Sequence, residues 1–570
     1  MIGDVTAWGT GYETAQDGDG DDEGRSGAGG RLSNLVGVAG GPAGNLALTV
    51  GLFLLYLVID RFADALVVID GDDLDRPVLL VAAMANRWYL FLVAVGLVAA
   101  GTVVEGRRLW CGWDSLDHGW ALRRFTAAAV VVLVWHYALY DYNYLAGQGH
   151  LADRWLVVAL GAAAVIRPIG LIPFAVQIHV MAGQFLVPFG TAADRNIEQV
   201  LLIVVVAAAA AHLRYVATRR TDTSDAVLVV TAGLAAHFFL PGWSKLRLDW
   251  LDHNDLSNLP LGAHSAGWLG GSDGWWADGL AVMLGRFGTV VMILTLVVEL
   301  AAPLAALRPT LARWWLPLAV LFNLSVFAVL GFWFLAWLTV EVGLLVLLWR
   351  DSTRRWLRAN ADLGRGLVGL AAATVGASLL FHPPGLVWFD APVSYGYRME
   401  AVGVSGERYN VPAAAFAPLD QEVAFLRLQL GPVQPASGAY GAVATVDDLE
   451  RLDGVRTPEQ LAAVEESLPP PTLTEESEEL IRAWLAHAND GWSDRFPMTA
   501  PGHFWTSAPD PEYHFDEPIQ RLEVFLVAEI HASEADDPAG TGTGEPRRRE
   551  TSVLVVEAPP PPPADDTPDG

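Results

Sequence analysis

The chain has one lysine, Lys245, and one cysteine, Cys111, in 570 residues. A single cysteine excludes an intramolecular disulfide and a metal site built from several thiolates. There is also no Gly-rich phosphate loop, no G-x-S-x-G turn, no H-E-x-x-H helix and no internal repeat. These absences give no support to nucleotide binding or hydrolysis.

Positive charge is scarce throughout the chain. The net charge is −28, yet 52% of the residues are hydrophobic and the mean hydropathy is +0.33. This acidity argues against nucleic acid as a partner. Arginine in place of lysine on an acidic chain is typical of extreme halophiles, and a GC-rich genome would also replace lysine codons. Chance survival of one lysine therefore stands as one explanation of Lys245.

Long apolar stretches fill the first two thirds of the chain. They lie at 44–69, 78–104, 124–145, 155–166, 169–187, 197–216, 226–243, 281–307, 314–330, 332–349 and 366–381. Stretches of about 20 apolar residues are typical of membrane-spanning helices. We predict a polytopic α-helical membrane protein with about 9–11 transmembrane helices over residues 41–382. Arg167-Pro168 separates 155–166 from 169–187, which predicts a half-helix, re-entrant segment or hairpin there.

The arginines set the expected orientation. They cluster in the connections near 107–124, 214–220, 308–313 and 350–365, whereas the connection 70–77 carries four aspartates. By the positive-inside rule these arginine clusters are cytoplasmic. Eleven crossings satisfy this rule, and so do nine if 155–187 is a hairpin. The N-terminus is then inside, and residues 385 onward lie outside the cell membrane.

The two ends and the last third of the chain have other textures. The run DGDGDDEGRSGAGG lacks the basic start and apolar core of a signal peptide, and residues 1–40 are expected to be a disordered acidic arm. Alternation in VSYGYRMEAVGVSG, RLEVFLVAEIHA and ETSVLVVEA predicts strands, the last two paired across 532–547. TPEQLAAVEESL and EESEELIRAWLAHA have helical spacing. We expect an extracytoplasmic α+β domain over 385–558 and a disordered Pro-rich tail over 559–570.

Lys245 follows Pro241-Gly242 at the expected outer end of a membrane helix, with Trp243 and Trp250 on either side. An interfacial anchor is the simplest role for such a residue, since lysine snorkels and tryptophan favours the headgroup level. Arginine snorkels equally well, and this chain uses arginine everywhere else. Arginine cannot readily lose its proton, whereas a buried lysine can become a usable base. That difference favours a functional role for Lys245.

The segment FLPGWSKLRLDW resembles the Ala-Gly-x-x-Lys-Leu-x-x-x-Trp signature of the vitamin K-dependent γ-carboxylases and their relatives with a horizontally transferred transmembrane (HTTM) domain. Gly242, Lys245, Leu246, Asp249 and Trp250 fit the signature. Proline stands at 241 where the family usually has alanine. Looser likenesses are Glu299 with Pro303, the helix FNLSVFAVLGFWF and the turn into PVSYGYRMEAVGVSGERY. The resemblance covers roughly residues 80 to 430, with the expected topology in agreement.

This resemblance implies that Lys245 deprotonates a reduced naphthoquinone of the menaquinol type, with O2 and CO2 as possible co-substrates. It further implies a quinone site lined by Trp243, Trp250, Glu299 and Asn323, and a protein substrate on the extracytoplasmic side. His150 in AGQGHLADRW is the candidate for the family's catalytic histidine, although a small gap is needed to align it. A polar loop histidine would be the ordinary reading of this residue. We expect His150 and Glu299 to line one outer chamber with Lys245.

Several departures from the family limit what is implied. Leu321, Phe322 and Asn323 stand where the family often has a histidine before a polar pair, and 167–225 is longer than in the carboxylases. The quinone half of the chemistry remains supported and the carboxylation of glutamate stays open. The alternative is a non-enzymatic membrane protein, either a transporter or an envelope assembly factor that binds a partner. A transporter should show paired interrupted helices in two repeats, but only Arg167-Pro168 interrupts one here.

Overall fold

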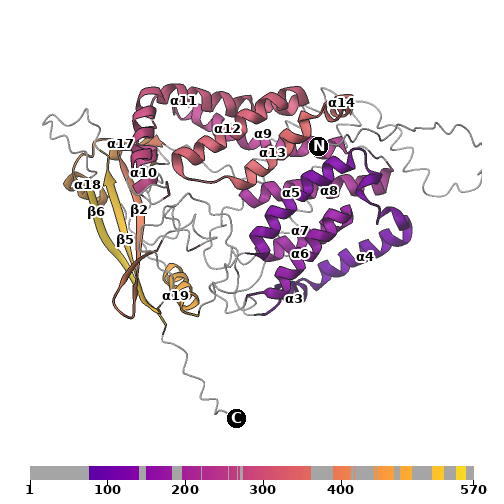
Figure 1. Ribbon diagram of the computed structural model, residues 1–570, viewed down its shortest axis with the longest axis horizontal. Coiled ribbons are helices and arrows are strands. Elements are labelled where there is room, and N and C mark those ends of the chain that lie inside the picture. Colours follow the sequence, from indigo (N-terminus) through magenta and orange to yellow (C-terminus); the bar gives the residue numbers. More distant parts are fainter. Residues whose placement is uncertain are drawn as a thin grey trace, which may run out of the picture.

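A helical bundle lies beside a small β-sheet in the computed structural model of the chain (Figure 1). The described residues are 76–139, 149–182, 196–219, 221, 223–254, 256–265, 268–269, 274–360, 389–411, 416, 442–443, 446–467, 475–490, 517–531 and 547–559. The predicted acidic arm over 1–40, the apolar stretches 44–69 and 366–381, and residues 560–570 of the predicted tail lie outside them.

Helices occupy each apolar stretch predicted between residues 78 and 349. In chain order they are α3 (Leu79–Asn86), α4 (Trp88–Glu105), α5 (Gly119–Ala138), α6 (Leu151–Ile166), α7 (Leu171–Ala182), α8 (Asn196–Thr218), α9 (Ser224–Arg247), α11 (Trp275–Leu307), α12 (Pro309–Leu330) and α13 (Leu335–Trp349). The short helices α10 (Asn258–Ser265) and α14 (Asp351–Asn360) complete this part. The bundle buries Leu133, Phe174, Ala235 and Leu344 completely.

Four helices in the described part of the chain are long and apolar enough to cross a membrane. They span Trp88–Arg108, Ala226–Arg247, Trp275–Ala305 and Pro309–Leu330. Shorter apolar helices lie at Pro168–Ala182, Val204–Val216 and Leu335–Trp349. Helix α4 has no buried residue, and its Val103 is 85% exposed. A large exposed apolar surface of this kind favours an apolar surrounding such as lipid.

The predicted interruption at Arg167-Pro168 is confirmed. Helix α6 ends at Ile166, a single 3-10 turn (η5, Pro168–Gly170) follows, and α7 then packs back against α6. A Cβ atom at Gly170 would lie 2.6 Å from the backbone nitrogen of Ala164. The turn therefore needs glycine at this position, because any larger residue would force the two helices apart.

The C-terminal part forms a four-stranded antiparallel sheet in the order β3-β2-β5-β6. Its strands are β2 (Val393–Gly403), β3 (Arg408–Val411), β5 (Ile519–Ile530) and β6 (Arg547–Glu557), while β1 (Phe389–Asp390) pairs with β4 (Ala442–Val443). Helices α17 (Val446–Asp453), α18 (Pro458–Glu466) and α19 (Glu475–Asn489) accompany the sheet. The predicted strands, the predicted pairing of the last two and both predicted helices are confirmed.

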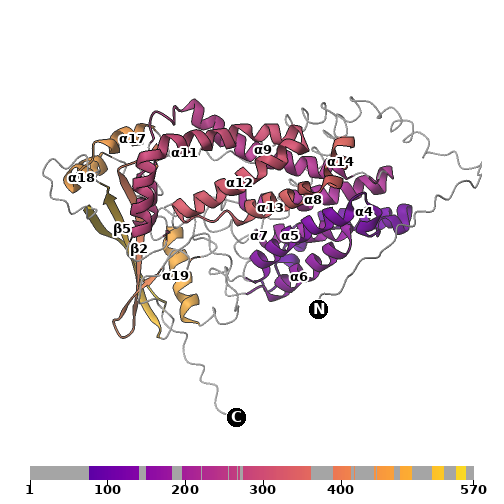
Figure 2. The ribbon, with the colours of Figure 1, turned by 45° about the horizontal axis from the view of Figure 1, so that its top comes forward.

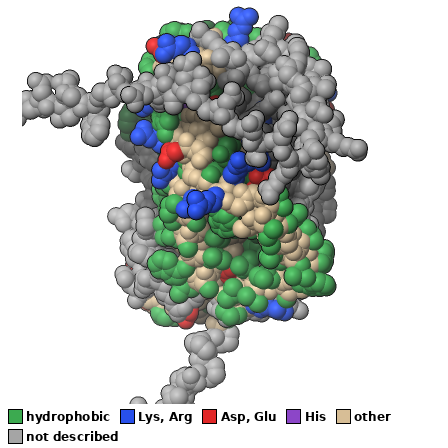
Figure 3. Space-filling view, turned by 90° about the vertical axis from the view of Figure 1, so that its right-hand side faces the viewer, with side chains coloured by type: hydrophobic (Ala, Val, Ile, Leu, Met, Phe, Trp, Pro, Cys, Tyr) green, Lys and Arg blue, Asp and Glu red, His purple; other side chains and the backbone are tan. Residues whose placement is uncertain are grey.

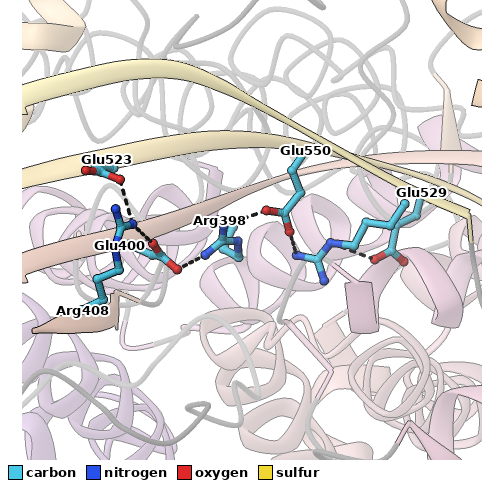
Figure 4. Close-up of polar contacts among 7 residues, drawn as sticks. Arg398, Glu400, Arg408, Glu523, Glu529 and Glu550 are labelled. Atoms are coloured by element: carbon cyan, nitrogen blue, oxygen red, sulfur yellow. Dashed lines mark hydrogen bonds and ion pairs between the residues drawn. The ribbon is translucent and has the colours of Figure 1, made fainter.

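Ion pairs link the strands of this sheet. Arg408 lies 2.8 Å from Glu523 and also contacts Glu400, while Arg398 contacts Glu400 and lies 2.7 Å from Glu550 (Figure 4). Arg548 continues the series to Glu550 and Glu529. Arg408 of β3 reaches across β2 to Glu523 of β5, and Arg398 of β2 reaches across β5 to Glu550 of β6. The ion pairs therefore tie together strands that are not direct neighbours, as well as strands that are.

The sheet stands at one end of the bundle, where β2 and β5 lie beside α11 (Figure 2). Leu284, Met292 and Leu296 of α11 share a buried cluster with Phe389 and Ile530. The C-terminal part therefore packs directly on the helices and extends their apolar core.

Candidate functional site

Lys245 lies in the last turn of α9, and the way this helix ends determines the surroundings of the lysine. Asp249 has a φ of 50°, in the left-handed region, and the N–H of Trp250 donates to the carbonyl of Lys245 at 3.1 Å. This six-to-one hydrogen bond is that of a Schellman cap. The cap folds the chain back, so that Lys245 Nζ lies 5.3 Å from the centre of the Trp250 ring. The five-residue spacing from lysine to tryptophan thus has a physical cause.

The ammonium of Lys245 donates a hydrogen bond to Oε1 of Glu299 on α11. Gly242, one turn before Lys245, allows the two helices to approach this closely, because a Cβ there would lie 2.7 Å from the Cβ of Glu299. Pro303 follows Glu299 by four residues and has no N–H to offer the Glu299 carbonyl. Pro241 and Gly242 of α9 and Pro303 of α11 therefore all lie within about one helical turn of the residues in this contact.

The pair is nearly closed to solvent. The side chain of Lys245 is 12% exposed and that of Glu299 is 4% exposed. Oε2 of Glu299 is buried and has no hydrogen-bond partner among the described residues. A buried carboxylate oxygen without a donor is costly, so an additional donor at this atom would be stabilising.

Trp250 is held by the C-terminal part of the protein. It is 5% exposed and belongs to the buried cluster that contains Leu296 of α11, Phe389, Leu452 and Ile530. One face of Trp250 meets the lysine, and the rest of its ring is buried against α11 and the C-terminal part of the protein. The residues of the C-terminal part that bury Trp250 beside Lys245 therefore lie far from both in the sequence.

Asp390 fixes the connection that carries Trp250. Its carboxylate accepts hydrogen bonds from the backbone N–H and the side-chain amide of Asn258, at 3.1 to 3.2 Å. Its own N–H donates to Oδ1 of Asn254 at 2.9 Å. No pattern in the sequence marks Asp390, since its role depends on the packing of β1 against the connection 248–258.

Asn323 belongs to a different polar contact. Its amide donates to Oε1 of Glu341, which joins α12 to α13, and Oε2 of Glu341 is buried without a hydrogen-bond partner among the described residues. One turn before Glu341, Trp337 stacks on His237 of α9 at 3.4 Å between ring centres. No hydrogen bond or ion pair among the described residues joins this cluster to Lys245 or Glu299.

The other two predicted site residues do not contact the lysine. Trp243 is 49% exposed and stacks on Phe239. His150 is buried just before α6, a helix whose Asp153 accepts hydrogen bonds from the first N–H groups of α3 and from Gln177 of α7. The structure thus brings Lys245, Trp250 and Glu299 together and leaves His150, Trp243 and Asn323 in other surroundings.

The Lys245–Glu299 pair can hold and exchange a proton. The hydrogen bond between them lets one proton lie on the amine or on the carboxylate. A ligand that donates to Oε2 of Glu299 would contact the oxygen that Lys245 leaves without a hydrogen bond. Trp250 supplies a flat π surface beside them.

The chain matches no protein-family model, no curated protein and no solved structure.

Proposed function

We propose that the protein is a polytopic membrane protein with nine or eleven crossings. Its four membrane-length helices and its shorter apolar helices support this architecture. Basic side chains lie among hydrophobic ones over the end of the molecule that contains α14 (Figure 3). By the positive-inside rule that end faces the cytoplasm, and the sheet at the opposite end is extracytoplasmic.

We further propose that Lys245 and Glu299 form the proton-accepting centre of an integral membrane enzyme. The observation that carries this proposal is the pairing of the only lysine with a buried glutamate that keeps one oxygen free of partners in the described structure. An anchor at a helix end needs no such partner. The family resemblance supports the same two residues independently.

A reduced naphthoquinone fits the site by its chemistry. Its hydroxyl can donate to Oε2 of Glu299, and its flat apolar ring suits the apolar side chains of Leu296 and Leu300, which pack in the same cluster as Trp250. When bound, a menaquinol supplies an acidic O–H and two electrons for O2. Once the Lys245 ammonium has passed its proton to Glu299, the neutral amine would take the O–H proton, and Trp250 would exclude water.

The test is menaquinol oxidation under oxygen by the purified protein and by Lys245→Arg. Arginine keeps the charge and stays protonated at any working pH, and general-base catalysis contributes roughly 10²- to 10⁴-fold. We expect a loss of that order in a folded, membrane-inserted variant. Arg247→Lys, at the same helix end, is the matched control and should keep its activity.

Full activity of Lys245→Arg would show that the lysine only anchors the helix. No quinol oxidation by the unmodified protein would favour the alternative, a non-enzymatic transporter or an envelope assembly factor. Carboxylation of a protein substrate is a separate question, answered by adding CO2 and an extracytoplasmic peptide rich in glutamate.

A further inference from the structure

An apolar groove of about 490 Å³ runs between α5 and α13, away from Lys245. Phe125 forms its floor at Gly343, where a Cβ would lie 2.5 Å from the Phe125 ring. Val342 and Val346 border the groove and are 44% and 62% exposed. From Leu335 to Arg350 the groove follows α13 for about 22 Å at 1.5 Å per residue. Its length and apolar lining match one extended acyl chain.

Two arginines stand together at the α14 end of this groove. Arg350 lies 4.4 Å and Arg124 5.6 Å from the centre of the Trp120 ring. Neither arginine forms an ion pair with a described residue, and the nearest acidic neighbour in the chain, Asp351, is already paired with Arg354. The groove therefore has two positive charges at one end and no described carboxylate to balance them.

We propose that the α5–α13 groove binds an anionic phospholipid of the cytoplasmic leaflet. The two guanidinium groups would hold the lipid phosphate, and one acyl chain would lie along Phe125, Gly343 and Val346. Arginine binds phosphate through paired N–H donors, and basic pockets between membrane helices on the cytoplasmic side bind acidic headgroups. This inference rests on the proposed membrane insertion, but on no part of the proposed chemistry at Lys245.

The first experiment measures binding of phosphatidylglycerol to the delipidated full-length protein in detergent by native mass spectrometry. Phosphatidylcholine and inorganic phosphate are the comparison ligands. Each basic residue near an anionic lipid surface adds a similar increment of binding free energy, so Arg124→Gln with Arg350→Gln should weaken phosphatidylglycerol binding roughly 30-fold. Arg107→Gln with Arg355→Gln removes the same charge from exposed sites outside the groove and should leave binding unchanged.

The second experiment fills the groove without changing charge. Ala128→Trp places a large ring in it, whereas Val103→Trp places the same ring on the exposed face of α4. We expect only the former to lose phosphatidylglycerol. Equal binding by the groove and control variants would overturn the proposal, as would inorganic phosphate binding as tightly as the lipid. Extraction of the protein from membranes by alkaline carbonate would instead contradict the membrane insertion itself.

Discussion

At the scale of single residues, Gly242 decides how close α9 and α11 can lie. A methyl group there would meet the Cβ of Glu299 at 2.7 Å, so Gly242→Ala must move one helix or break the Lys245–Glu299 pair. Overpacking of this kind costs about 1–3 kcal/mol. We expect a lower thermal midpoint and at least a tenfold loss of quinol oxidation.

The matched control for this change is Gly279→Ala in α11, where a Cβ would meet nothing within 4 Å. Alanine stabilises a helix interior by up to about 1 kcal/mol relative to glycine, so this variant should be at least as stable as the parent. If both variants behaved alike, the close approach at Gly242 would be unimportant.

His531 gives the C-terminal part of the protein a pH-dependent stability. Its side chain is buried, its Nε2 lies 2.8 Å from Oγ of Ser394, and burial lowers the pKa of His531 to about 4. The unfolded chain, with a pKa near 6.5, binds the proton more readily between pH 4 and 6.5. Stability is therefore complete above pH 6.5 and falls as the pH is lowered, by about 2 kcal/mol between pH 7 and 5.

The measurement is the thermal midpoint of the full-length protein at both pH values, by circular dichroism. His531→Gln should show a smaller difference between pH 7 and 5 than the parent. His487→Gln, in α19 of the same domain, should retain the parent's difference. An unchanged difference in His531→Gln would assign the pH dependence to other groups.

The sequence pointed to Lys245, Glu299 and Trp250 because each carries a local signal: a unique residue type, a charge in an apolar helix and a signature spacing. It did not point to Asp390, since an aspartate at a strand end has no pattern of its own. It also grouped Asn323 with Lys245, whereas the contact of Asn323 is with Glu341. Which charged side chains meet depends on the rotation of each helix, and uniformly apolar helices carry little periodicity to reveal it.

At the scale of elements, the connection after α9 and strand β1 act as one unit through Asp390. Asp390→Ala would remove three acceptor contacts to Asn258 and leave its two half-buried donors without this partner, at a cost of about 1–2 kcal/mol. We expect proteolytic cleavage near residues 248–258 and a fall in kcat, because Trp250 would no longer be held over Lys245. Asp453→Ala, on the exposed side of α17, should change neither.

Asp390→Asn separates a positioning role from general destabilisation. The amide keeps one acceptor oxygen, so this variant should recover part of the activity that Asp390→Ala loses. If Asp390→Ala lost stability while its kcat stayed intact, the position of Trp250 would not depend on the hydrogen bonds of Asp390.

Elements with strong local signals could be predicted well from the sequence. The α6–α7 interruption follows from Arg167-Pro168, and the β5–β6 pair follows from two alternating segments that flank one polar loop. The order of strands was beyond the sequence, because β2 pairs with β5 across more than a hundred residues. Such pairing depends on the tertiary fit of side chains and not on a turn.

At the scale of the whole molecule, the arginine distribution predicts an outside C-terminal domain and an inside N-terminus. Protease added to intact cells should digest residues 389–559 and spare an N-terminal tag, while permeabilised cells should lose both. Immunoblots of the two ends measure this. A protected C-terminal domain in intact cells would reverse the orientation and place Lys245 near the cytoplasm.

The burial of Trp250 also implies an order of assembly during synthesis. Trp250 and Glu299 precede the residues that cover them, since Asp390 follows Asn258 by 132 residues and Ile530 comes later still. At ribosomal rates of about 5–20 residues per second, this interval is on the order of tens of seconds. During that time the Trp250 of a nascent chain lacks the C-terminal residues that bury it beside the Lys245–Glu299 pair, so the proposed base would reach its final surroundings only when translation is almost complete.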